Sequence, residues 1–476
     1  MKKQHFVLSA TVVAVSLALA ACGGSGSLTA GSSTTTQGVI TGFGSVFVNG
    51  VEYDTGNSTT IDMEGVDSPE SALKVGMLVT LQGAVNADGK TGIATAIKYA
   101  NQMEGVVNAN TVAANETGTL TVMGETVNVT PDTIFESKVA GITSPNLIQL
   151  GNIAEVSGYA SSTGVVTATR IEVKAAALAA GEVIELKGTI SGLDTANKSF
   201  MLGSVTVDYS GVTPADLPNV ALADDQYVEV KTTTTYAGTG NLIAASIELT
   251  DDGVKGHDGQ EGEDLEVKGM VTADFTNSKF ELNGRSVTVD ANTEFDHGDT
   301  TQLLTGTKVK VETHFDANGN LVADSIEFKQ ASELEFAGTL EAVDTTAGTV
   351  TIMGQVFYVD NNTVMLDDSD AAVRFFKLSD LSVASSDHLE MNAYLDSTTG
   401  HLIATKLERN NIPTSASEAM VTGTADTTSA LMVSGITVDT STATGTLPTL
   451  STGSKVEITG TYSNGVLYAS LVTLVN

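Results

Sequence analysis

Short stretches in which apolar and polar residues alternate follow one another along most of this chain. Ser286–Val289 and Lys308–Val311 each place valine at every second position. A period of two is typical of strands with one buried face. The pairs Asn49-Gly50 and Asn283-Gly284 lie between such runs and fit type I′ hairpin turns, because both central residues of that turn need a positive φ. The pattern therefore predicts an all-β protein.

Three landmarks recur six times in the same order: an opening strand with a glycine, a hairpin of the form apolar-x-Gly, and a closing strand such as Ala94–Ile97. The opening glycines are Gly38, Gly105, Gly188, Gly269, Gly338 and Gly423. They are 67 to 85 residues apart, so each copy is long enough to be a small domain rather than one turn of a solenoid. On folding, domains of this size bury a smaller fraction of the surface of their unfolded chain than larger domains do. We therefore expect neighbouring copies to pack together.

Each copy is predicted to contain three strands, a connector and two further strands. The connectors carry weak helical or 3₁₀ signals at Ser68–Leu73, Thr301–Leu304 and Asp370–Phe376. Five strands with a short helix between the third and the fourth have the connectivity of an OB-like Greek-key barrel. The sequence therefore predicts six tandem five-stranded OB-like barrels, with another small barrel or sandwich as the alternative.

The division of the chain follows from these landmarks and from changes in composition. The predicted segments are a signal peptide at 1–21, a lipidated cysteine and flexible tether at 22–37, repeat 1 at 38–102, repeat 2 at 103–176, repeat 3 at 183–250, an acidic linker at 251–262, repeat 4 at 263–330, repeat 5 at 331–410 and repeat 6 at 411–476.

The first residues indicate where the protein is located. Lys2 and Lys3 precede an apolar run of 16 residues, which is shorter than a membrane span and typical of a signal peptide. Leu19–Cys22 resembles a bacterial lipobox, which implies cleavage before Cys22 and attachment of diacylglycerol to its thiol. Gly23 is not the aspartate that often retains lipoproteins at the inner membrane. We therefore expect an outer-membrane lipoprotein that faces either the periplasm or the cell surface.

The repeats resemble a known family. Gly42–Tyr53, Leu73–Met77 and Ala94–Ile97 look like a bacterial repeat domain of unknown function that is often found in tandem in predicted lipoproteins. The resemblance supports the fold and implies no reaction. Copies three and five depart from it, because Asp225-Gln226 and Ser386-Asp387 replace the glycine that precedes the fourth strand elsewhere. These two turns are expected to differ from the others.

Charge and cysteine content exclude several classes of protein. With 23 basic and 57 acidic side chains, the formal net charge is -34, so the chain would repel a nucleic acid. One cysteine cannot form an intramolecular disulfide or a Cys-x-x-Cys site. The expected partners are the membrane, through the lipid, and a protein or glycan. The absence of tryptophan weakens the case for a glycan.

The motifs of common enzymes are missing from the sequence. It contains neither His-Glu-x-x-His nor Gly-x-Ser-x-Gly. Gly42-Phe43-Gly44 opens a strand rather than a helix, which argues against a phosphate-binding loop. We therefore expect a protein that is not an enzyme and that needs no cofactor.

Clusters of carboxylates suggest a site for Ca²⁺, which prefers six to eight oxygen ligands. The candidates are Asp258 and Glu261 in the acidic linker and Asp316 in repeat 4. Asp316 occupies a position where other copies have turn-forming pairs, so it is expected to be a hairpin residue first. His297 and His314, with nearby aspartates, form a weaker candidate site for a transition metal.

Two functions from different classes remain. The leading hypothesis is a non-catalytic, lipid-anchored envelope protein whose tandem barrels form a binding or structural module. The alternative is a periplasmic lipoprotein that binds Ca²⁺ or a small ligand. Four aromatic residues lie on predicted second and third strands, where OB-like barrels bind ligands, but we expect them to pack in the cores. They are Phe47, Tyr53, Phe357 and Tyr358.

Overall fold

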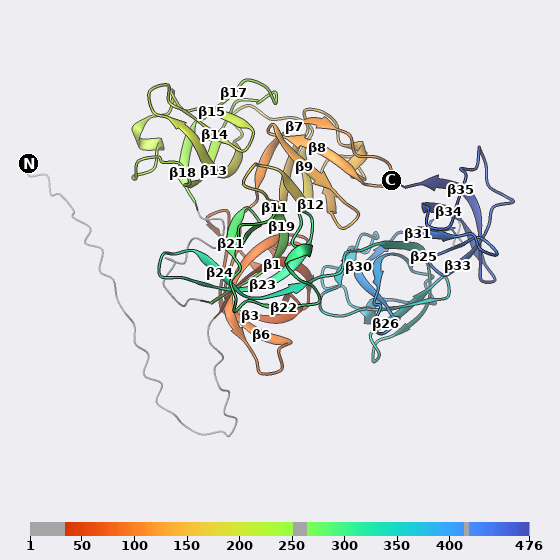
Figure 1. The fold of residues 1–476 in the computed structure, drawn as a ribbon. Coiled ribbons are helices and arrows are strands. Elements are labelled where there is room, and N and C mark those ends of the chain that lie inside the picture. The colour runs from red at the N-terminus through yellow and green to blue at the C-terminus, as the bar shows by residue number, and fades with distance from the viewer. Residues whose placement is uncertain (1–33, 251–263, 414–417, 476) are drawn as a thin grey trace, which may run out of the picture.

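The computed structural model describes residues 34–250, 264–413 and 418–475, which form six small β-barrels (Figure 1). The signal peptide, Cys22 and the acidic linker lie outside the described residues. Within the described residues, no helix is long and apolar enough to cross a membrane. Strand β1 begins at Thr34, so the last four residues of the expected tether belong to the first barrel.

Barrel 1 shows how each repeat closes. Its strands are β1 (Thr34–Phe43), β2 (Val46–Val48), β3 (Val51–Met63), β4 (Val66–Asp67), β5 (Leu78–Val85) and β6 (Thr91–Tyr99), with the 3₁₀ helix η1 (Glu70–Ala72) before β5. The five main strands pair in the closed order β1-β2-β3-β6-β5-β1, in which β3 and β6 are parallel. This is the OB-like Greek-key barrel that the sequence predicted.

The other five barrels repeat this order with small variations. Barrel 2 contains β7 (Met103–Asn110), β8 (Gly118–Val122), β9 (Glu125–Val129), β10 (Ile134–Ser137), η2 (Pro145–Leu147), β11 (Ile153–Ala160) and β12 (Val166–Ala175). Barrel 3 contains β13 (Ile184–Asp194), β14 (Ser199–Leu202), β15 (Val205–Asp208), η3 (Pro214–Asp216), β16 (Tyr227–Thr232), β17 (Asn241–Ile243) and β18 (Ser246–Leu249). In barrel 3 the closing strand is therefore split in two.

Barrels 4 to 6 complete the chain. Barrel 4 contains β19 (Asp264–Thr276), β20 (Lys279–Leu282), β21 (Arg285–Thr288), β22 (Glu294–Asp296), η4 (Thr300–Gln302), β23 (Lys308–Phe315) and β24 (Leu321–Phe328). Barrel 5 contains β25 (Leu334–Asp344), β26 (Thr349–Ile352), β27 (Gln355–Tyr358), β28 (Val364–Asp367), η5 (Leu378–Asp380), β29 (His388–Leu395) and β30 (Leu402–Asn410). Barrel 6 contains β31 (Glu418–Asp426), β32 (Met432–Val433), β33 (Ile436–Asp439), β34 (Lys455–Ser463) and β35 (Val466–Leu474).

The predicted hairpin turns are present between the second and third strands. Asn49 and Gly50 have φ of 54° and 85°, and Asn283 and Gly284 have φ of 49° and 82°. The Asn49 side chain also donates to the carbonyl of Gln37 at 3.0 Å, which ties the hairpin to the opening strand. The prediction of positive φ at both central residues is confirmed.

The turn before the fourth strand has a positive φ in all six barrels, and the prediction that barrel 3 differs is wrong. Barrel 5 does differ in its hydrogen bonding, because the Ser386 N–H donates to Val383 O within the turn at 3.0 Å. Asp225 and Ser386 adopt positive φ of 68° and 54°, like Gly76 at 88°. The N–H of Asp225 donates to Ile190 O just as that of Gly76 donates to Ile40 O, both at 2.9 Å. The opening strand holds this turn in a left-handed conformation even where the residue is not glycine.

One connector prediction is also wrong. The 3₁₀ helix of barrel 5 is η5 (Leu378–Asp380), and the predicted helical segment 370–376 forms turns instead. This segment contacts barrel 1. The Arg374 guanidinium lies 4.1 Å from the ring centre of Phe43 and donates to the carbonyl oxygens of Glu70 and Leu73 at 2.6 and 2.7 Å. These contacts with another barrel override the weak local helix signal.

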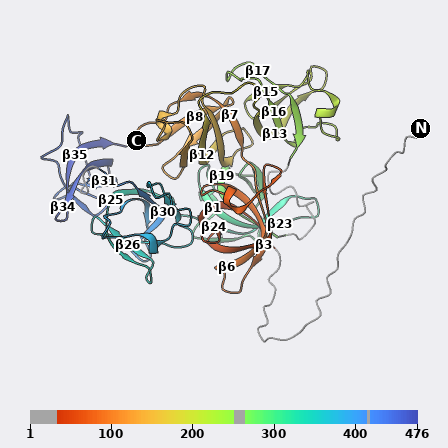
Figure 2. The same ribbon diagram turned by 180° about the vertical axis from the view of Figure 1, so that it is seen from behind.

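The barrels are joined in pairs through their opening strands. Strand β7 pairs with β13, and β25 with β31, both antiparallel, which joins barrels 2 and 3 and barrels 5 and 6. Strand β1 pairs in parallel with β19 and joins barrels 1 and 4, which are not consecutive. The chain therefore folds back on itself, and barrels 1 and 4 lie together between the other two pairs (Figures 1 and 2).

A carboxylate in barrel 2 connects three barrels. Asp132 forms an ion pair of 2.6 Å with Lys308 of barrel 4. It also accepts from Ser332 and Asn392, both at 3.1 Å, next to and within barrel 5. The burial of Asp132 alone would raise its pKa, but Lys308 and these hydrogen bonds lower it. Asp132 therefore helps to hold the three pairs of barrels against one another.

The apolar cores follow the same pairing. One continuous cluster fills barrels 2 and 3, and a second fills barrels 5 and 6. Of the four aromatic residues on second and third strands, Tyr53 is buried in the core of barrel 1 and Phe357 in the core of barrel 5, as expected. Phe47 and Tyr358 are only partly buried, and Tyr358 stacks on His401 with ring centres 4.0 Å apart.

Candidate functional site

Charged side chains surround a hollow where barrels 1, 2 and 3 meet. A cleft of about 670 Å³ opens there. Its floor is the surface of the sheet that runs from barrel 2 into barrel 3, and its other wall comes from barrel 1, including Met63, Lys74 and Tyr99. The cleft therefore exists only because the three barrels are joined.

The register of the strands places five glutamates side by side on this floor. Going from strand to strand, Glu136 is opposite Glu172, Glu172 is opposite Glu155, Glu155 is opposite Glu104, and Glu104 is opposite Glu185. All five line the cleft, and we call them the glutamate row. Neighbouring strands lie about 4.8 Å apart, and like charges directly opposite each other are unfavourable. The row therefore needs compensating cations.

Cations on the flanks neutralise part of the glutamate row. Lys138 pairs with Glu172 at 2.6 Å, and the buried Arg170 pairs with Glu136. Lys174 pairs with Glu155 at 2.7 Å but lies 3.9 Å from Glu104. Glu104, the fourth of the five, is thus more weakly paired than Glu155 and Glu172, the other two glutamates that Lys174 and Lys138 contact.

The pKa values of the row reflect this imbalance. Burial is the main cause that raises the pKa of Glu104 to about 7; Lys174 lowers this pKa, whereas the charges of Glu155 and Glu185 raise it. Burial and nearby carboxylates also raise the pKa of Glu185, against the effect of Lys187. The end of the row formed by Glu104 and Glu185 therefore binds protons more tightly than ordinary glutamates do.

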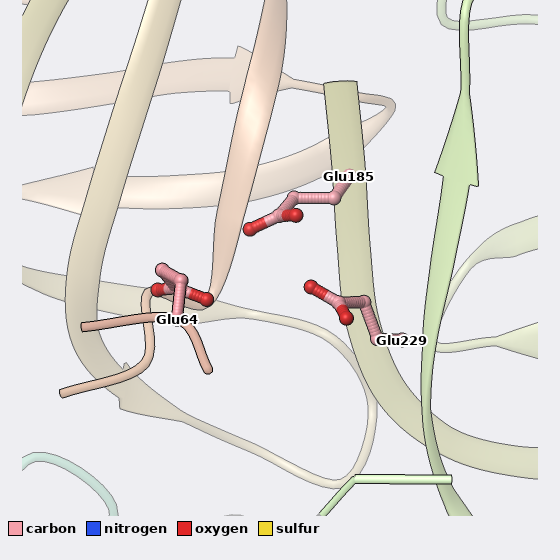
Figure 3. A group of neighbouring side chains, drawn as sticks. All are labelled: Glu64, Glu185 and Glu229. Carbon is pink, nitrogen blue, oxygen red and sulfur yellow. The ribbon is translucent and has the colours of Figure 1, made fainter. Parts of the chain in front are cut away.

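At the end of the glutamate row that Glu185 forms, three carboxylates surround one buried ammonium group. Glu64, Glu185 and Glu229 turn their oxygens toward one another, within 4.8 Å, as a metal site would require (Figure 3). The Lys187 Nζ lies 2.8, 2.9 and 3.2 Å from them and 2.9 Å from the side-chain oxygen of Asn101. Although burial would lower the pKa of Lys187, the three carboxylates raise it. Lys187 therefore supplies the positive charge that this group of carboxylates needs.

These contacts also fasten barrel 1 onto the paired barrels. Glu64 belongs to the turn after β3, while Lys187 lies on β13 of barrel 3. The Tyr99 hydroxyl on β6 donates to Glu155 of barrel 2 at 2.8 Å, and burial raises the pKa of Tyr99. The charged side chains of the cleft are thus engaged in joining barrels.

A second buried ion pair lies inside barrel 5. Arg409 donates from Nε and Nη2 to the two carboxylate oxygens of Asp367 at 2.9 and 2.5 Å. Burial alone would raise the pKa of Asp367, but hydrogen bonds from Arg409, Ser369 and the Val373 N–H lower it to about 2. The pair ties the extra strand β28 and the turn after it to the closing strand β30.

Of the three metal-ligand candidates predicted from the sequence, the structure describes one, Asp316. Asp258 and Glu261, like Cys22, lie outside the described residues. Asp316 accepts hydrogen bonds from the backbone N–H groups of Asn318 and Asn320, both at 2.8 Å. These bonds, with those from the Asn320 side chain, lower the pKa of Asp316 to about 2. It is a turn residue, as the sequence analysis expected first.

In the structure, each of the two histidine candidates contacts a single aspartate. His314 lies 2.8 Å from Asp324, and His297 lies 3.0 Å from Asp296. Both contacts are exposed at the surface of barrel 4. Each contact joins one histidine to one aspartate, and neither assembles the set of ligands that a transition metal needs.

The sequence analysis missed the glutamate row. A signal was present, because Glu185-Leu186-Lys187 and Glu229-Val230-Lys231 alternate charged and apolar residues on strands. The alternation shows that one face of the strand carries charges. It does not show that this face would be covered by another barrel, which depends on how the repeats pair.

Comparison with family models identifies the family to which the repeats are related. A model described as a domain of unknown function, DUF5666, matches residues 37–98, 104–172, 187–248, 268–327, 337–408 and 418–473. The chain belongs to the DUF5666 family. The six DUF5666 matches coincide with the six barrels, and the predicted membership in a tandem-repeat family of unknown function is confirmed.

Other comparisons add little to the DUF5666 relationship. No curated protein matches the chain. A solved structure titled "drosophila Unr CSD456" is similar at 15% sequence identity, with a TM-score of 0.11, and covers 47% of this chain and 95% of that one. The description of the barrels rests on their strand pairing.

Proposed function

We propose that this DUF5666 protein is a non-catalytic, lipid-anchored scaffold of the bacterial cell envelope. Cys22 carries the lipid, and the six barrels form one body that binds a protein or glycan partner through its surface. The body is held at the outer membrane, in the periplasm or at the cell surface. The proposal requires no cofactor and no nucleic acid.

The observation that supports this proposal is the way the barrels are joined. Opening strands pair between barrels 1 and 4, which are far apart in sequence, and Asp132 connects barrels 2, 4 and 5. Such contacts favour a body of fixed shape over independent domains on a flexible string. The buried charges at the joints, above all Lys187 and its three carboxylates, have structural partners rather than the geometry of a nucleophile, a base and a charge stabiliser.

Calcium or small-ligand binding, the alternative from the sequence, has less support. The Asp316 carboxylate accepts hydrogen bonds within its own turn. Asp258 and Glu261 lie outside the described residues. In the described part of the chain, the carboxylates close enough to share a metal are those around Lys187. An ammonium group already occupies the centre of that group.

The anchor gives the first test. With Cys22→Ser the protein should lose its lipid and move from the membrane fraction to the soluble fraction after cell breakage, because no second signal holds it there. Fractionation at high salt, followed by mass spectrometry of the N-terminus, measures both the location and the acyl chains. The unaltered chain should remain in the membrane fraction and carry the lipid.

A Ser16→Ala variant provides the matched control, because it changes the apolar leader and leaves Cys22 in place. The anchor would be wrong if the Cys22→Ser chain stayed with the membrane as firmly as the control. It would also be wrong if the N-terminus of the unaltered chain carried no acyl group. An epitope after Asn476, probed on intact cells, then tells whether the barrels face outward.

A further inference from the structure

Each pairing of opening strands between two barrels forms a seam. The seam between barrels 2 and 3 differs from the seams that join barrels 1 and 4 and barrels 5 and 6. Strands β7 and β13 are joined by two residue pairs, Met103 with Leu186 and Glu104 with Glu185. The other two seams have three pairs each. Half of the shortest seam therefore consists of two glutamates directly opposite each other.

The neighbours of Glu104 leave this opposition only partly compensated. On its other side Glu104 is opposite Glu155, so it lies between two glutamates within one sheet. The nearest cation given by the ion pairs is Lys174, 3.9 Å away. The charged and titratable groups that face this region from β11, β12, β10, β13, β16 and barrel 1 are Glu155, Glu172, Lys174, Arg170, Glu136, Lys138, Glu185, Lys187, Glu229, Lys231, Glu64, Lys74 and Tyr99.

Two carboxylates at directly opposite, partly buried positions of neighbouring strands do not ionise independently. The first to lose its proton raises the cost of ionising the second, so the pair retains a proton to higher pH than a single glutamate. The seam between barrels 5 and 6 lacks this feature, because there Glu335 is opposite Thr422. The opposition of two acids is a property of the seam between barrels 2 and 3.

We propose that the seam between barrels 2 and 3 is a proton-dependent joint, closed when Glu104 carries a proton opposite Glu185 and loosened when both are ionised. The inference goes beyond the proposed scaffold and does not depend on the lipid anchor. Residues 176–183 connect the two barrels and are mostly exposed, with Gly181 in a left-handed conformation, so the connection adds little resistance to movement.

The direction of the pH effect follows from the pKa of Glu104, which in the folded protein is raised from an ordinary 4.5 to about 7, mainly by burial, with Lys174 lowering it and Glu155 and Glu185 raising it. A carboxyl whose pKa is raised by a contact stabilises that contact fully below its ordinary pKa. The stabilisation is lost as the pH rises through the higher value. The seam should therefore be firm at pH 5.5 and loosen between pH 6 and 8.

Hydrogen–deuterium exchange on the full chain with Cys22→Ser tests the joint. After correction for the intrinsic rate, amides of β7 and β13 at the seam should be about tenfold less protected at pH 8.0 than at pH 5.5. Glu104→Gln imitates the protonated side chain, so this variant should show less than a twofold change between the two pH values. Strand β35 of barrel 6, which carries no carboxylate, serves as the internal reference in each experiment.

Glu312→Gln is the matched control, because it removes one negative charge from an exposed position on β23, away from the seam. It should keep the full pH dependence at the seam. Should Glu104→Gln fail to fold, Glu185→Gln removes the same opposition from the other strand. Equal protection of the seam at both pH values would overturn the proposal, as would an unchanged pH dependence in the folded Gln variant or a change of equal size in β35.

Discussion

Replacing Lys187 with methionine is expected to lower the local free energy of unfolding of barrel 3 by about 3–5 kcal/mol, the range measured when one partner of a buried ion pair is removed. The side chain of Lys187 is 3% exposed, and its ammonium group contacts Glu64, Glu185 and Glu229. Without it, three carboxylates within 4.8 Å of one another have lost their shared cation. Native-state hydrogen exchange of β13 and β16 measures the loss.

Two further variants make the Lys187 result specific. Lys279→Met removes an exposed lysine of barrel 4 and should change stability by less than about 0.5 kcal/mol. Adding Glu185→Gln to Lys187→Met removes one of the uncompensated charges and should recover part of the loss. If Lys187→Met cost no more than Lys279→Met, the ammonium group would not be what holds barrel 1 onto barrel 3.

Asp367→Asn is expected to destabilise barrel 5 by about 2–4 kcal/mol at pH 7, because it leaves the Arg409 guanidinium without its two-point partner. The Asp367 side chain is fully buried, and its pKa in the folded barrel is about 2. A carboxyl with a lowered pKa contributes stability above its ordinary pKa and loses it as the pH falls toward the lower value. The difference between the two proteins should therefore shrink between pH 4 and pH 2.

Hydrogen exchange of β28 and β30 amides measures the effect of Asp367→Asn where it arises. Asp54→Asn, at an exposed position of β3, is the matched control and should change stability little. A loss at pH 7 no larger than that of Asp54→Asn would contradict the account of this ion pair. So would a loss that stayed constant down to pH 2.

The barrel fold was predictable because its signals are local. Alternating valines mark the strands, and Asn49-Gly50 and Asn283-Gly284 mark hairpins whose φ values the structure confirms. Repetition of the same order six times strengthened each weak signal. The segment 370–376 misled because its conformation depends on Arg374 reaching barrel 1, a contact between residues about 300 positions apart.

The joints and the cleft were not predictable, because they depend on the relative register of separate repeats. The sequence shows that Glu104 and Glu185 lie on strands, but not that β7 pairs with β13 so that the two face each other. In the same way, nothing local indicates that β1 pairs with β19 across more than 200 residues. The candidate metal ligands were chosen from acidic segments of the sequence, whereas the charged groups of the cleft lie where barrels 1, 2 and 3 meet.

Small-angle X-ray scattering of the Cys22→Ser chain tests most directly the central claim that the six barrels form one folded-back body. A fully compact protein of this length has a radius of gyration of roughly 22 Å, and six such barrels in a straight row would have about 50 Å. We predict about 25–32 Å, because the paired barrels are joined into a body that is compact but not spherical (Figure 1). A radius of about 45 Å or more would contradict the account, since it would mean that barrels 1 and 4 are apart in solution.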